Sequence, residues 1–240
     1  MSLELVFDYV VSPTFVRGAV MTLLLTVCSL FFGVLVGLVI ALLQDSKTKA
    51  LHGVTLAYLW LFRGTPVLFQ IIFVYNVLPS FGIRLSAFVS AVLALSLNEG
   101  AYMAEILRSG LQAVKKGQRT AGLALGMTGA QVMRFVVIPQ AARVVLPPIG
   151  NQMIGMLKLT ALVSAIAVQE LLLVANQTAS ADFRYFEALT AAGIYYLMMT
   201  TVFMGLLNLL ERALDPKKRQ RRRMTLTERL LGSGTSPAIR

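Results

Sequence analysis

The feature that most constrains this chain is a set of long apolar runs separated by short polar segments. A helix needs about 20 apolar residues to cross the hydrocarbon core of a bilayer. Runs of that size lie at about 18–43, 54–78, 85–107, 144–174 and 186–210. Only 14% of the residues are charged, against about 25% in soluble domains. Because backbone groups in lipid must be hydrogen bonded within a helix, the sequence predicts an all-α integral membrane protein with five transmembrane helices.

The positive charges are distributed unevenly, and their distribution predicts how the helices are oriented. Loops on the cytoplasmic side of a membrane carry an excess of lysine and arginine. With the N-terminus outside, the outer segments hold three of these residues and the inner segments hold eighteen. We therefore expect an outside N-terminus and a cytoplasmic C-terminus. The net charge of +11 is then mostly a signal of topology, and the basic stretch at 217–223 is expected at the membrane surface instead of on nucleic acid.

The two ends of the sequence suggest how the chain is divided. The start carries Glu4 and Asp8 and no basic segment, so we expect no cleaved signal peptide and expect the first apolar run to stay in the membrane. The last residues are polar and contain glycine and serine, which is typical of a disordered terminus. We therefore expect a transmembrane domain over 1–214 with a cytoplasmic coupling loop at about 111–143, and a basic, partly disordered cytoplasmic tail over 215–240.

The chain lacks the residue clusters that support catalysis or metal binding. Its single cysteine, Cys28, and single histidine, His52, lie apart, which excludes a disulfide framework and leaves no metal-binding cluster. The dipeptide Lys47-Thr48 lacks the glycines of a phosphate-binding loop. The sequence therefore predicts no catalytic residue, no metal ion and no cofactor bound by this chain. Two alternatives are a membrane-embedded enzyme that uses Glu99 or Glu105, and a stand-alone secondary transporter, although no internal repeat is visible.

Ionisable side chains inside the apolar runs are the first candidates for function, because burying a charge in a membrane is costly. The sequence places Glu99, Glu105, Lys158 and Glu170 there. On straight helices, Glu99 and Lys158 each lie about 21 Å from the start of their run, at comparable depth. They form either a structural ion pair between the third and fourth helices or a pair of opposite charges that brackets a charged substrate. Glu170 is expected near the outer end of the fourth run, as a gate or as a hydrated rim residue.

A polar stripe on the third run supplies further candidates. Asn98, Tyr102 and Glu105 are spaced so that they share one face of a helix, and such a face must contact protein or water. Glu99 and Glu105 lie about 120° apart around the helix, so we expect no acid–base pair between them. The candidates for the substrate path are therefore Glu99, Asn98, Tyr102, Lys158, Glu105 and Thr160.

Glycine and proline predict two local features of the packing. Gly33 and Gly37 form a small-xxx-small spacing, which lets two membrane helices approach closely. Pro66 follows Arg63-Gly64-Thr65 inside the second run, and because proline cannot donate to the helix ladder, a helix is expected to start or kink there. The residues before it, 50–62, then predict a short interfacial helix with aromatic side chains at headgroup level. We interpret the segment as an elbow at the inner membrane face without direct contact to substrate.

The long polar segment between the third and fourth runs predicts structure of its own. Ala121 to Leu125 favours a helix, Gly126 breaks it, and Thr128 can cap a new short helix. Pro139 and the Pro147-Pro148 pair are expected to limit the extension of that second helix. The segment therefore predicts two short helices joined at a glycine, which form a docking element on the inner membrane face.

This segment resembles the EAA loop of binding-protein-dependent ABC importers. Thr120-Ala121-Gly122, Gly126 and Pro139 keep the spacing of the family's pattern, although Thr120 stands where the family has glutamate. The resemblance extends from the first apolar run to about Leu214. The chain is similar to the polar amino acid permease subfamily at FRGTP (62–66), AYMAEILRSG (101–110), KKGQ (115–118), ALGMT (124–128), IPQAARVVLPP (138–148) and LKLTALVS (157–164). In the last of these motifs, Leu159 replaces an aspartate that is common in the family.

The resemblance implies a type I importer fold and a place in a larger assembly. It implies a pair of identical or homologous permease subunits that form the path by alternating access, a cytoplasmic ATPase dimer that binds ATP and Mg²⁺, and an external substrate-binding protein. The chain would be a multi-pass protein of the cell inner membrane, in contact with lipid. Its cargo would be a polar amino acid, and Glu99 favours a cationic or zwitterionic one, or an opine. The short helix after Gly126 would couple to the ATPase through Ala121, Gly122, Gly126, Met127, Thr128, Gly129, Ala130, Gln131 and Pro139.

Overall fold

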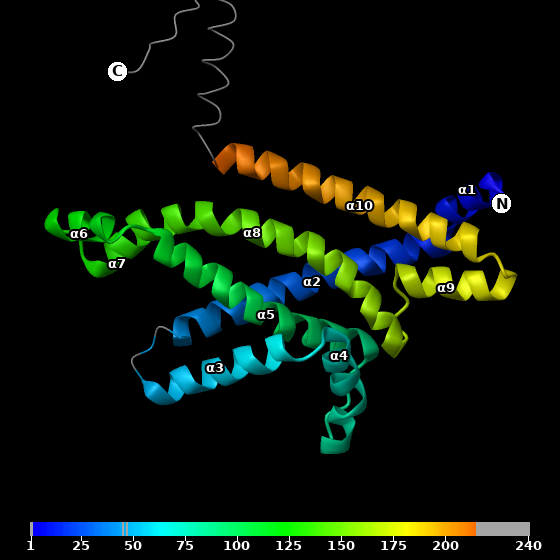
Figure 1. Ribbon diagram of the computed structural model, residues 1–240, viewed down its shortest axis with the longest axis horizontal. Helices are drawn as coiled ribbons and strands as arrows, with labels where there is room; N and C mark the ends of the chain where they lie inside the picture. The colour runs from blue at the N-terminus through cyan, green and yellow to red at the C-terminus, as the bar shows by residue number, and fades with distance from the viewer. Residues whose placement is uncertain (1, 45, 47, 215–240) are drawn as a thin grey trace, which may run out of the picture.

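The computed structural model describes residues 2–44, 46 and 48–214, and every regular element among them is helical (Figure 1). The predicted tail at 215–240 and the basic residue Lys47 lie outside the described residues. In chain order the elements are α1 (Leu3–Val11), α2 (Pro13–Gln44), α3 (Lys49–Gly64), α4 (Val67–Asn76), the 3-10 turn η1 (Leu78–Phe81), α5 (Ala87–Ala113), α6 (Lys116–Ala124), α7 (Gly129–Gln131), the π-helical turn η2 (Val132–Val137), α8 (Ile138–Leu159), the 3-10 segment η3 (Thr160–Ile166), α9 (Leu171–Asp182) and α10 (Tyr185–Leu214).

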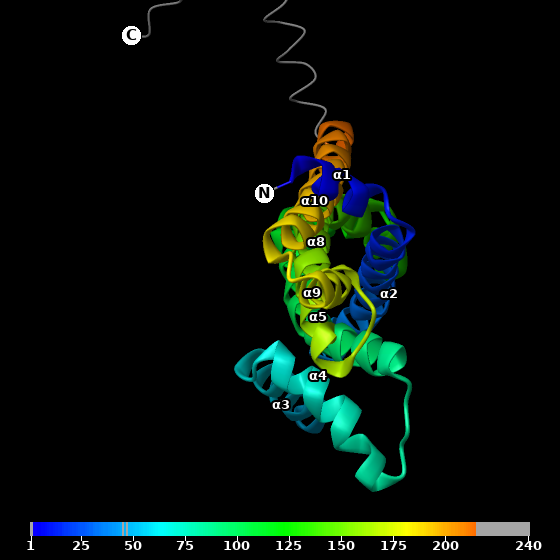
Figure 2. The same cartoon turned by 90° about the vertical axis from the view of Figure 1, so that its right-hand side faces the viewer.

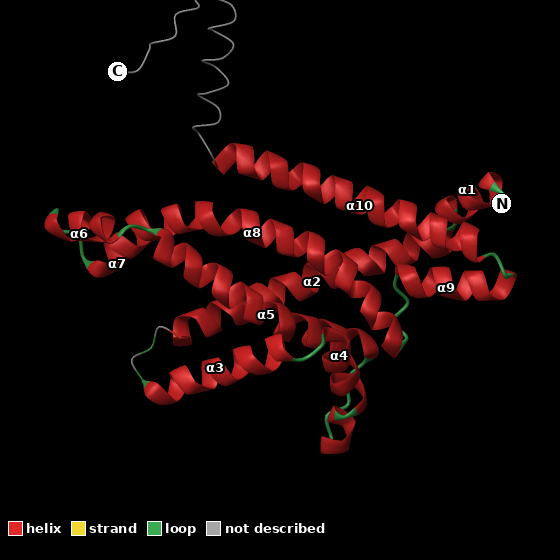
Figure 3. Ribbon diagram, viewed as in Figure 1, coloured by secondary structure: helices red, strands yellow, loops and turns green. Residues whose placement is uncertain are grey.

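Long helices lie side by side and form the body of the molecule. Figure 1 shows α2, α5, α8 and α10 along the long axis, with α6 and α7 at one end and α1 and α9 at the other. Figure 3 shows that short loops join these helices. Four segments are long and apolar enough to cross a membrane, and α3 with α4 supplies a fifth if the two form one broken span. The predicted all-α membrane fold is therefore confirmed.

Glycines allow α2 and α5 to pack at very short range. A β-carbon on Gly33 would lie 2.8 Å from the β-carbon of Glu99, and one on Gly37 would lie 2.9 Å from the backbone nitrogen of Ala104. Both distances are shorter than real side chains tolerate, so the contact requires glycine. On α5, the facing residue Gly100 likewise leaves room for α2. The predicted close approach at the small-xxx-small spacing is confirmed, and α5 is its partner.

A sharp elbow joins α3 to α4, and the two helix axes bend by 104° (Figure 2). Thr65 and Pro66 separate the helices, which confirms the break predicted at the proline. The amide of Gln70 donates to the carbonyl oxygens of Phe62 at 3.0 Å and of Thr65 at 3.1 Å. Gln70 is buried, so it supplies within the protein the hydrogen bonds that the broken helix lacks and that lipid cannot provide.

A helix covers residues 50–62, as expected, and it packs against long helices of the body. These residues belong to α3, which runs alongside α2 and α5, whereas α4 turns away from the long axis of the body (Figure 1). Thr55 and Leu59 are buried, and the hydroxyl of Tyr58 donates to the carbonyl oxygen of Leu97 on α5.

The predicted span over 144–174 is wrong at both ends. Its helix, α8, begins at Ile138 and ends at Leu159, after which the chain forms η3 and turns at Ala167 with a φ of 59°. The hydroxyl of Thr160 donates to the carbonyl oxygen of Leu157 at 2.7 Å. Such local side-chain hydrogen bonds compete with helix continuation. Uniform apolar composition therefore conceals a break inside the fourth run.

Glu170 caps α9 and does not lie at a hydrated rim or act as an exposed gate. Its side chain is fully buried. It accepts hydrogen bonds from the backbone N–H groups of Leu172 at 2.8 Å and Leu173 at 2.6 Å, and from the hydroxyl of Tyr196 at 3.1 Å. A carboxylate at this position satisfies amides that lack partners and faces the positive end of the helix dipole. The sequence-based expectation for Glu170 is therefore corrected to a structural cap.

The prolines after Thr128 do not limit the second helix as expected. The turn α7 continues through η2 into α8, and the N–H of Ile138 bonds to the carbonyl oxygen of Met133 in the π-helical register. Pro139 lies in the first turn of α8 and the Pro147-Pro148 pair lies inside it. A change from the π to the α register alters which carbonyl oxygens need an N–H donor. The helix can therefore continue through Pro139, which has no N–H to donate. The result is one helical segment from Gly129 to Ile166.

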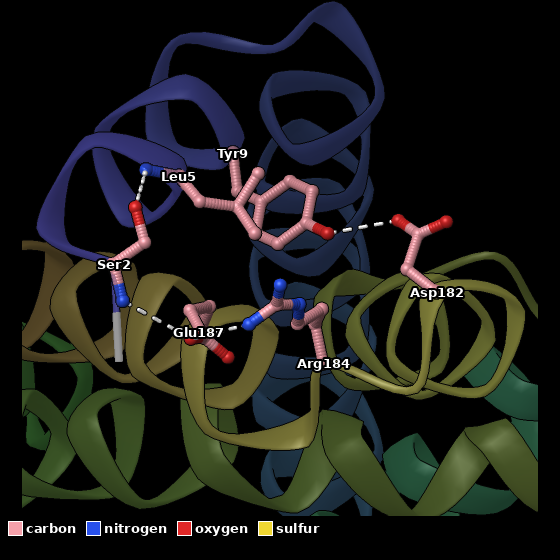
Figure 4. A network of polar contacts seen from close by, with 6 residues as sticks. All are labelled: Ser2, Leu5, Tyr9, Asp182, Arg184 and Glu187. Atoms are coloured by element: carbon pink, nitrogen blue, oxygen red, sulfur yellow. Dashed lines mark hydrogen bonds and ion pairs between the residues drawn. The ribbon is translucent and has the colours of Figure 1, made fainter.

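A polar network ties the first helix to the turn between α9 and α10 (Figure 4). The backbone N–H of Ser2 donates to Oε1 of Glu187 at 3.2 Å, and the hydroxyl of Tyr9 donates to Asp182 at 2.8 Å. Arg184 forms an ion pair with Glu187 at 3.7 Å. These contacts join segments that are distant in sequence, and they fix α1 against one end of the body.

Replacing Gly37 by alanine is expected to lower the thermal stability of the purified protein. The added carbon would meet the α5 backbone at Ala104, and overpacking a tight core costs about 1–3 kcal/mol. Gly205→Ala on α10 is the matched control, since nothing lies within 4 Å of its added carbon. Melting temperatures in detergent check the pair, and equal values for the two variants would contradict the close α2–α5 contact.

Replacing Gln70 by leucine is expected to loosen the elbow. The substitution removes the hydrogen bonds to the carbonyl oxygens of Phe62 and Thr65 and the acceptor for the amide of Asn98, and a buried polar group left without a partner costs about 1–3 kcal/mol. Amide hydrogen exchange, followed by mass spectrometry, should become faster in α3 and α4 than in α10. The control is Gln112→Leu, at an exposed position of α5, which should leave the exchange of α3 and α4 unchanged.

Candidate functional site

The predicted polar stripe on α5 faces the α3–α4 elbow and an open groove. Asn98 is buried, and its amide donates to the carbonyl oxygen of Phe62 at 2.9 Å and to Oε1 of Gln70 at 3.1 Å. Tyr102, one turn further along α5, is 38% exposed, and Glu105 is also exposed. The stripe therefore has two parts: Asn98 holds the elbow, while the other two side chains are accessible to a ligand.

Arg63, in the last turn of α3, completes this part of the site. Its guanidinium forms an ion pair with Glu105 and lies 5.6 Å from the ring centroid of Tyr102. The elbow, which we interpreted as having no direct contact to substrate, therefore contacts two of the candidate path residues through Arg63. The signal that could have found it is an arginine inside an apolar run, which is the same signal that singled out Glu105.

A pocket of about 580 Å³ opens beside the ion pair. Small-molecule sites in proteins usually have volumes of about 300–1,000 Å³ and combine apolar walls with a few placed polar groups. This pocket has that mixture, because its walls include Gln44, Leu59, Trp60, Arg63, Tyr102 and Glu105. The site can therefore recognise a small ligand by charge, by aromatic contact and by apolar contact together.

Glu99 and Lys158 do not form the ion pair that their comparable depth suggested. Glu99 is 2% exposed, lies against Gly33, and faces Gln152 of α8. Lys158 is exposed and lies six residues after Gln152, so it points to a different side of α8. Within the part of the chain that the structure describes, no ion pair joins the two. Glu99 is an interior residue of the α2–α5 contact.

A second polar face lies on α8. Asn151 and Lys158 are exposed and seven residues apart, which places them on one side of the helix. The α5–α8 contact runs through Gly110, which accommodates Val145. The angle of a residue around its helix axis can be counted from this contact at about 100° per residue. By that count Tyr102 and Glu105 on α5 lie on the same side of the helix pair as the α8 face, and α2 packs on the opposite side. Thr160 is fully buried and does not contribute to this face.

The α6–α7 segment forms a compact element at one end of the body (Figure 1). Gly122 on α6 packs against Val132. Gly126 adopts a φ of 80°, a conformation that glycine reaches without strain. Thr128 caps α7 through a capping box with Gln131. The predicted glycine break and threonine cap are both confirmed, and the apolar core of the element consists of Val114, Val132, Val137 and Ala141.

Most of the residues predicted to couple to a partner lie on the surface of this element. Gly122 is buried and Met127 is half-buried, whereas the other predicted residues are exposed: Ala121, Gly126, Thr128, Gly129, Ala130, Gln131 and Pro139. Leu123 and Leu125 are exposed as well, the latter to 83%. A contiguous exposed patch of small and apolar residues is typical of a protein–protein contact.

Charge recognition is the chemistry that these sites support. The described residues contain no group of histidine, cysteine, aspartate and glutamate side chains placed to hold a metal ion. Nδ1 of His52 lies 3.3 Å from the carbonyl oxygen of Gln44, and Cys28 is partly buried in α2.

Comparison with known proteins identifies the class of molecule. Residues 33–217 match the family described as binding-protein-dependent transport system inner membrane component. The probable amino-acid permease protein YxeN of Bacillus subtilis is 36% identical over 206 residues, which cover 85% of this chain and 92% of that protein. The glutamine transport system permease protein GlnP of Escherichia coli is 37% identical over 202 residues, which cover 83% and 92%. A solved structure of an amino acid ABC transporter with histidines has a TM-score of 0.81 and 43% identity, and the match covers 89% of this chain and 100% of that one.

These matches decide between the alternatives that the sequence left open. The matched family is a component of a transport system that depends on a binding protein, which neither a membrane-embedded enzyme nor a stand-alone secondary transporter is. The resemblance drawn from the EAA loop and the permease motifs is confirmed, and so is the multi-pass membrane fold. The chain therefore belongs to the family of binding-protein-dependent transport system inner membrane components, the permease components of ABC importers.

Proposed function

We propose that this chain is one permease subunit of an ATP-driven amino acid importer, in which a second permease subunit covers its open polar side. The observation that carries the proposal is the exposure of Tyr102, Glu105, Asn151 and Lys158 on spanning helices. Charged and amide side chains are costly in lipid, and in membrane proteins they face other protein or water. A partner subunit, identical or homologous, would enclose them in a polar path. The relatives named as amino-acid and glutamine permeases support an amino acid as the cargo.

The candidate path residues have different roles in this proposal. The side chains that would line the path are Tyr102, Glu105 and Lys158, together with Arg63 and Asn151. Asn98, Glu99 and Thr160 are buried, and they would hold α5 and α8 in position behind the path. Because Glu99 lies inside the α2–α5 contact, it gives no support to a preference for cationic cargo.

The proposed assembly assigns a partner to each end of the body. The α6–α7 element would bind a cytoplasmic ATPase subunit, which would hold ATP and Mg²⁺, while α1 and α9 would lie toward the external binding protein. The excess of lysine and arginine in the inner segments supports this orientation. In this proposal residues 1–214 form the permease domain, residues 215–240 lie in the cytoplasm, and the family description supports the cell inner membrane as the location.

A glutamate on the coupling surface is expected to separate the permease from its ATPase. Ala130→Glu places a charge on the exposed side of α7, and Ala181→Glu, which places one on α9 at the opposite end of the body (Figure 1), is the matched control for ATPase copurification. Both are tested with coexpressed ATPase and binding protein in proteoliposomes. We expect Ala130→Glu to reduce ATPase copurification and ATP-dependent uptake of L-glutamine and L-arginine by about tenfold, because an unpaired charge is costly in an interface. Ion-coupled uptake by the permease alone would contradict the proposal.

Labelling of introduced thiols checks the orientation. In a Cys28→Ser background, which removes the single native cysteine, Ser180→Cys on α9 and Ala130→Cys on α7 each offer one exposed thiol. A membrane-impermeant maleimide should label the first in intact spheroplasts and the second only after lysis. The opposite pattern would show that the N-terminus lies inside.

A further inference from the structure

We propose that Arg63 and Glu105 form a binding site for the charged backbone groups of a free amino acid, with Arg63 on the α-carboxylate and Glu105 on the α-ammonium. The inference rests on the proposed import function and names the part of the cargo that the site recognises. The two side chains come from different helices, α3 and α5, and form an ion pair with each other at the edge of the pocket.

The charges of this pair are complementary to those of any zwitterionic amino acid. An amino acid carries its carboxylate and its ammonium on one carbon, so a site that binds both needs a cation and an anion side by side. The ion pair places the Arg63 guanidinium against the Glu105 carboxylate and meets that requirement. Arginine offers two parallel N–H donors to a carboxylate, and a carboxylate accepts from an ammonium group.

A ligand that separates Arg63 from Glu105 loses little free energy by breaking their ion pair. The side chain of Arg63 is 41% exposed and that of Glu105 is 48% exposed, and ion pairs with this exposure contribute little to stability. A zwitterion brings one opposite charge for each partner, so binding exchanges one ion pair for two. A ligand with a single charge would leave either the arginine or the glutamate without a partner.

The pocket beside the pair provides space for the rest of the ligand. Leu56, Leu59 and Trp60 form an apolar wall, which suits the aliphatic part of an amino acid side chain. The ring of Tyr102 supports the guanidinium at 5.6 Å from its centroid. Gln44 adds a buried side-chain oxygen that has no hydrogen-bond partner among the described residues. The pocket therefore combines an apolar wall with the two charges.

Buried hydrogen bonds fix the frame that carries both charges. The residue before Arg63 is Phe62, whose carbonyl oxygen accepts from Asn98 at 2.9 Å and from Gln70 at 3.0 Å. Asn98 lies one turn from Tyr102 on α5, so the same contact positions the helix that carries Glu105. Sites held by such supporting contacts are preorganised for binding. Because it recognises backbone groups, the site would accept amino acids with different side chains.

Binding of chemically blocked ligands tests the assignment group by group. The permease–ATPase complex, purified without binding protein or nucleotide, is titrated with radiolabelled L-glutamine and L-arginine, and their Nα-acetyl and α-amide forms compete. In the wild type, each blocked form should bind about tenfold more weakly or worse, because it leaves one charge without its partner. In Glu105→Gln the penalty for acetylation should disappear while the penalty for the amide remains. In Arg63→Gln the penalty for the amide should disappear while the penalty for acetylation remains.

Glu4→Gln and Arg84→Gln are the matched controls, because both residues are exposed and lie outside the pocket. Both controls should keep the wild-type ranking of the ligands, and melting temperatures show that every variant is folded. Equal weakening of all ligand forms in both pocket variants would overturn the inference and give the pair a structural role.

Two further outcomes separate this inference from the proposed function and from lipid binding. A wild-type complex that imports amino acids with its binding protein but does not bind them in the purified state would overturn the inference and leave the import function intact. Loss of import itself would contradict the proposed function. Loss of binding in phosphatidylethanolamine nanodiscs, with binding retained in phosphatidylglycerol nanodiscs, would assign the pair to a zwitterionic lipid headgroup.

Discussion

Glycines at the crossing of α2 and α5 bring two spanning helices into backbone contact, and the rest of the structure is arranged around that contact. Helices in lipid gain little from hydrophobic burial, so their association depends on close packing and hydrogen bonds. Gly33 and Gly37 provide the packing, and Glu99 fills the space against Gly33. With α2 on one side of α5 and α8 beside it, only one side of α5 can remain open, and Tyr102 lies there.

The elbow between α3 and α4 meets the second demand of the membrane, which is that broken backbone needs partners. Gln70 and Asn98 both donate to the carbonyl oxygen of Phe62. Two amides from separate helices thus replace the hydrogen bonds lost at Pro66. The same arrangement places Arg63 next to Glu105, so the structural solution and the candidate binding site share one set of contacts.

Sequence reasoning succeeded where a single local rule governs the structure. Bilayer thickness fixes the length of an apolar run, and Gly126 and Thr128 follow local preferences at helix ends. It failed where helix packing decides which apolar segment ends a helix and which polar side chain is buried. The break after Leu159 lies in an apolar run, and the charge of Glu170 marks a special position there without saying that it caps a helix. The burial of Glu99 and the exposure of Lys158 depend on which helix packs on which side, and that information is absent from the spacing of either residue.

The helical segment from Gly129 to Ile166, 38 residues long and with its α-helical part ending at Leu159, has a mechanical consequence. It begins in the element proposed to meet the ATPase and passes through Asn151 and Lys158 on the proposed path. A helix is stiff along its axis. A displacement of α7 would therefore move those side chains as well, because no flexible loop lies between them. The π-helical turn and the Pro147-Pro148 pair are the points at which this helical segment can bend. Any movement of the ATPase would then change the shape of the path directly.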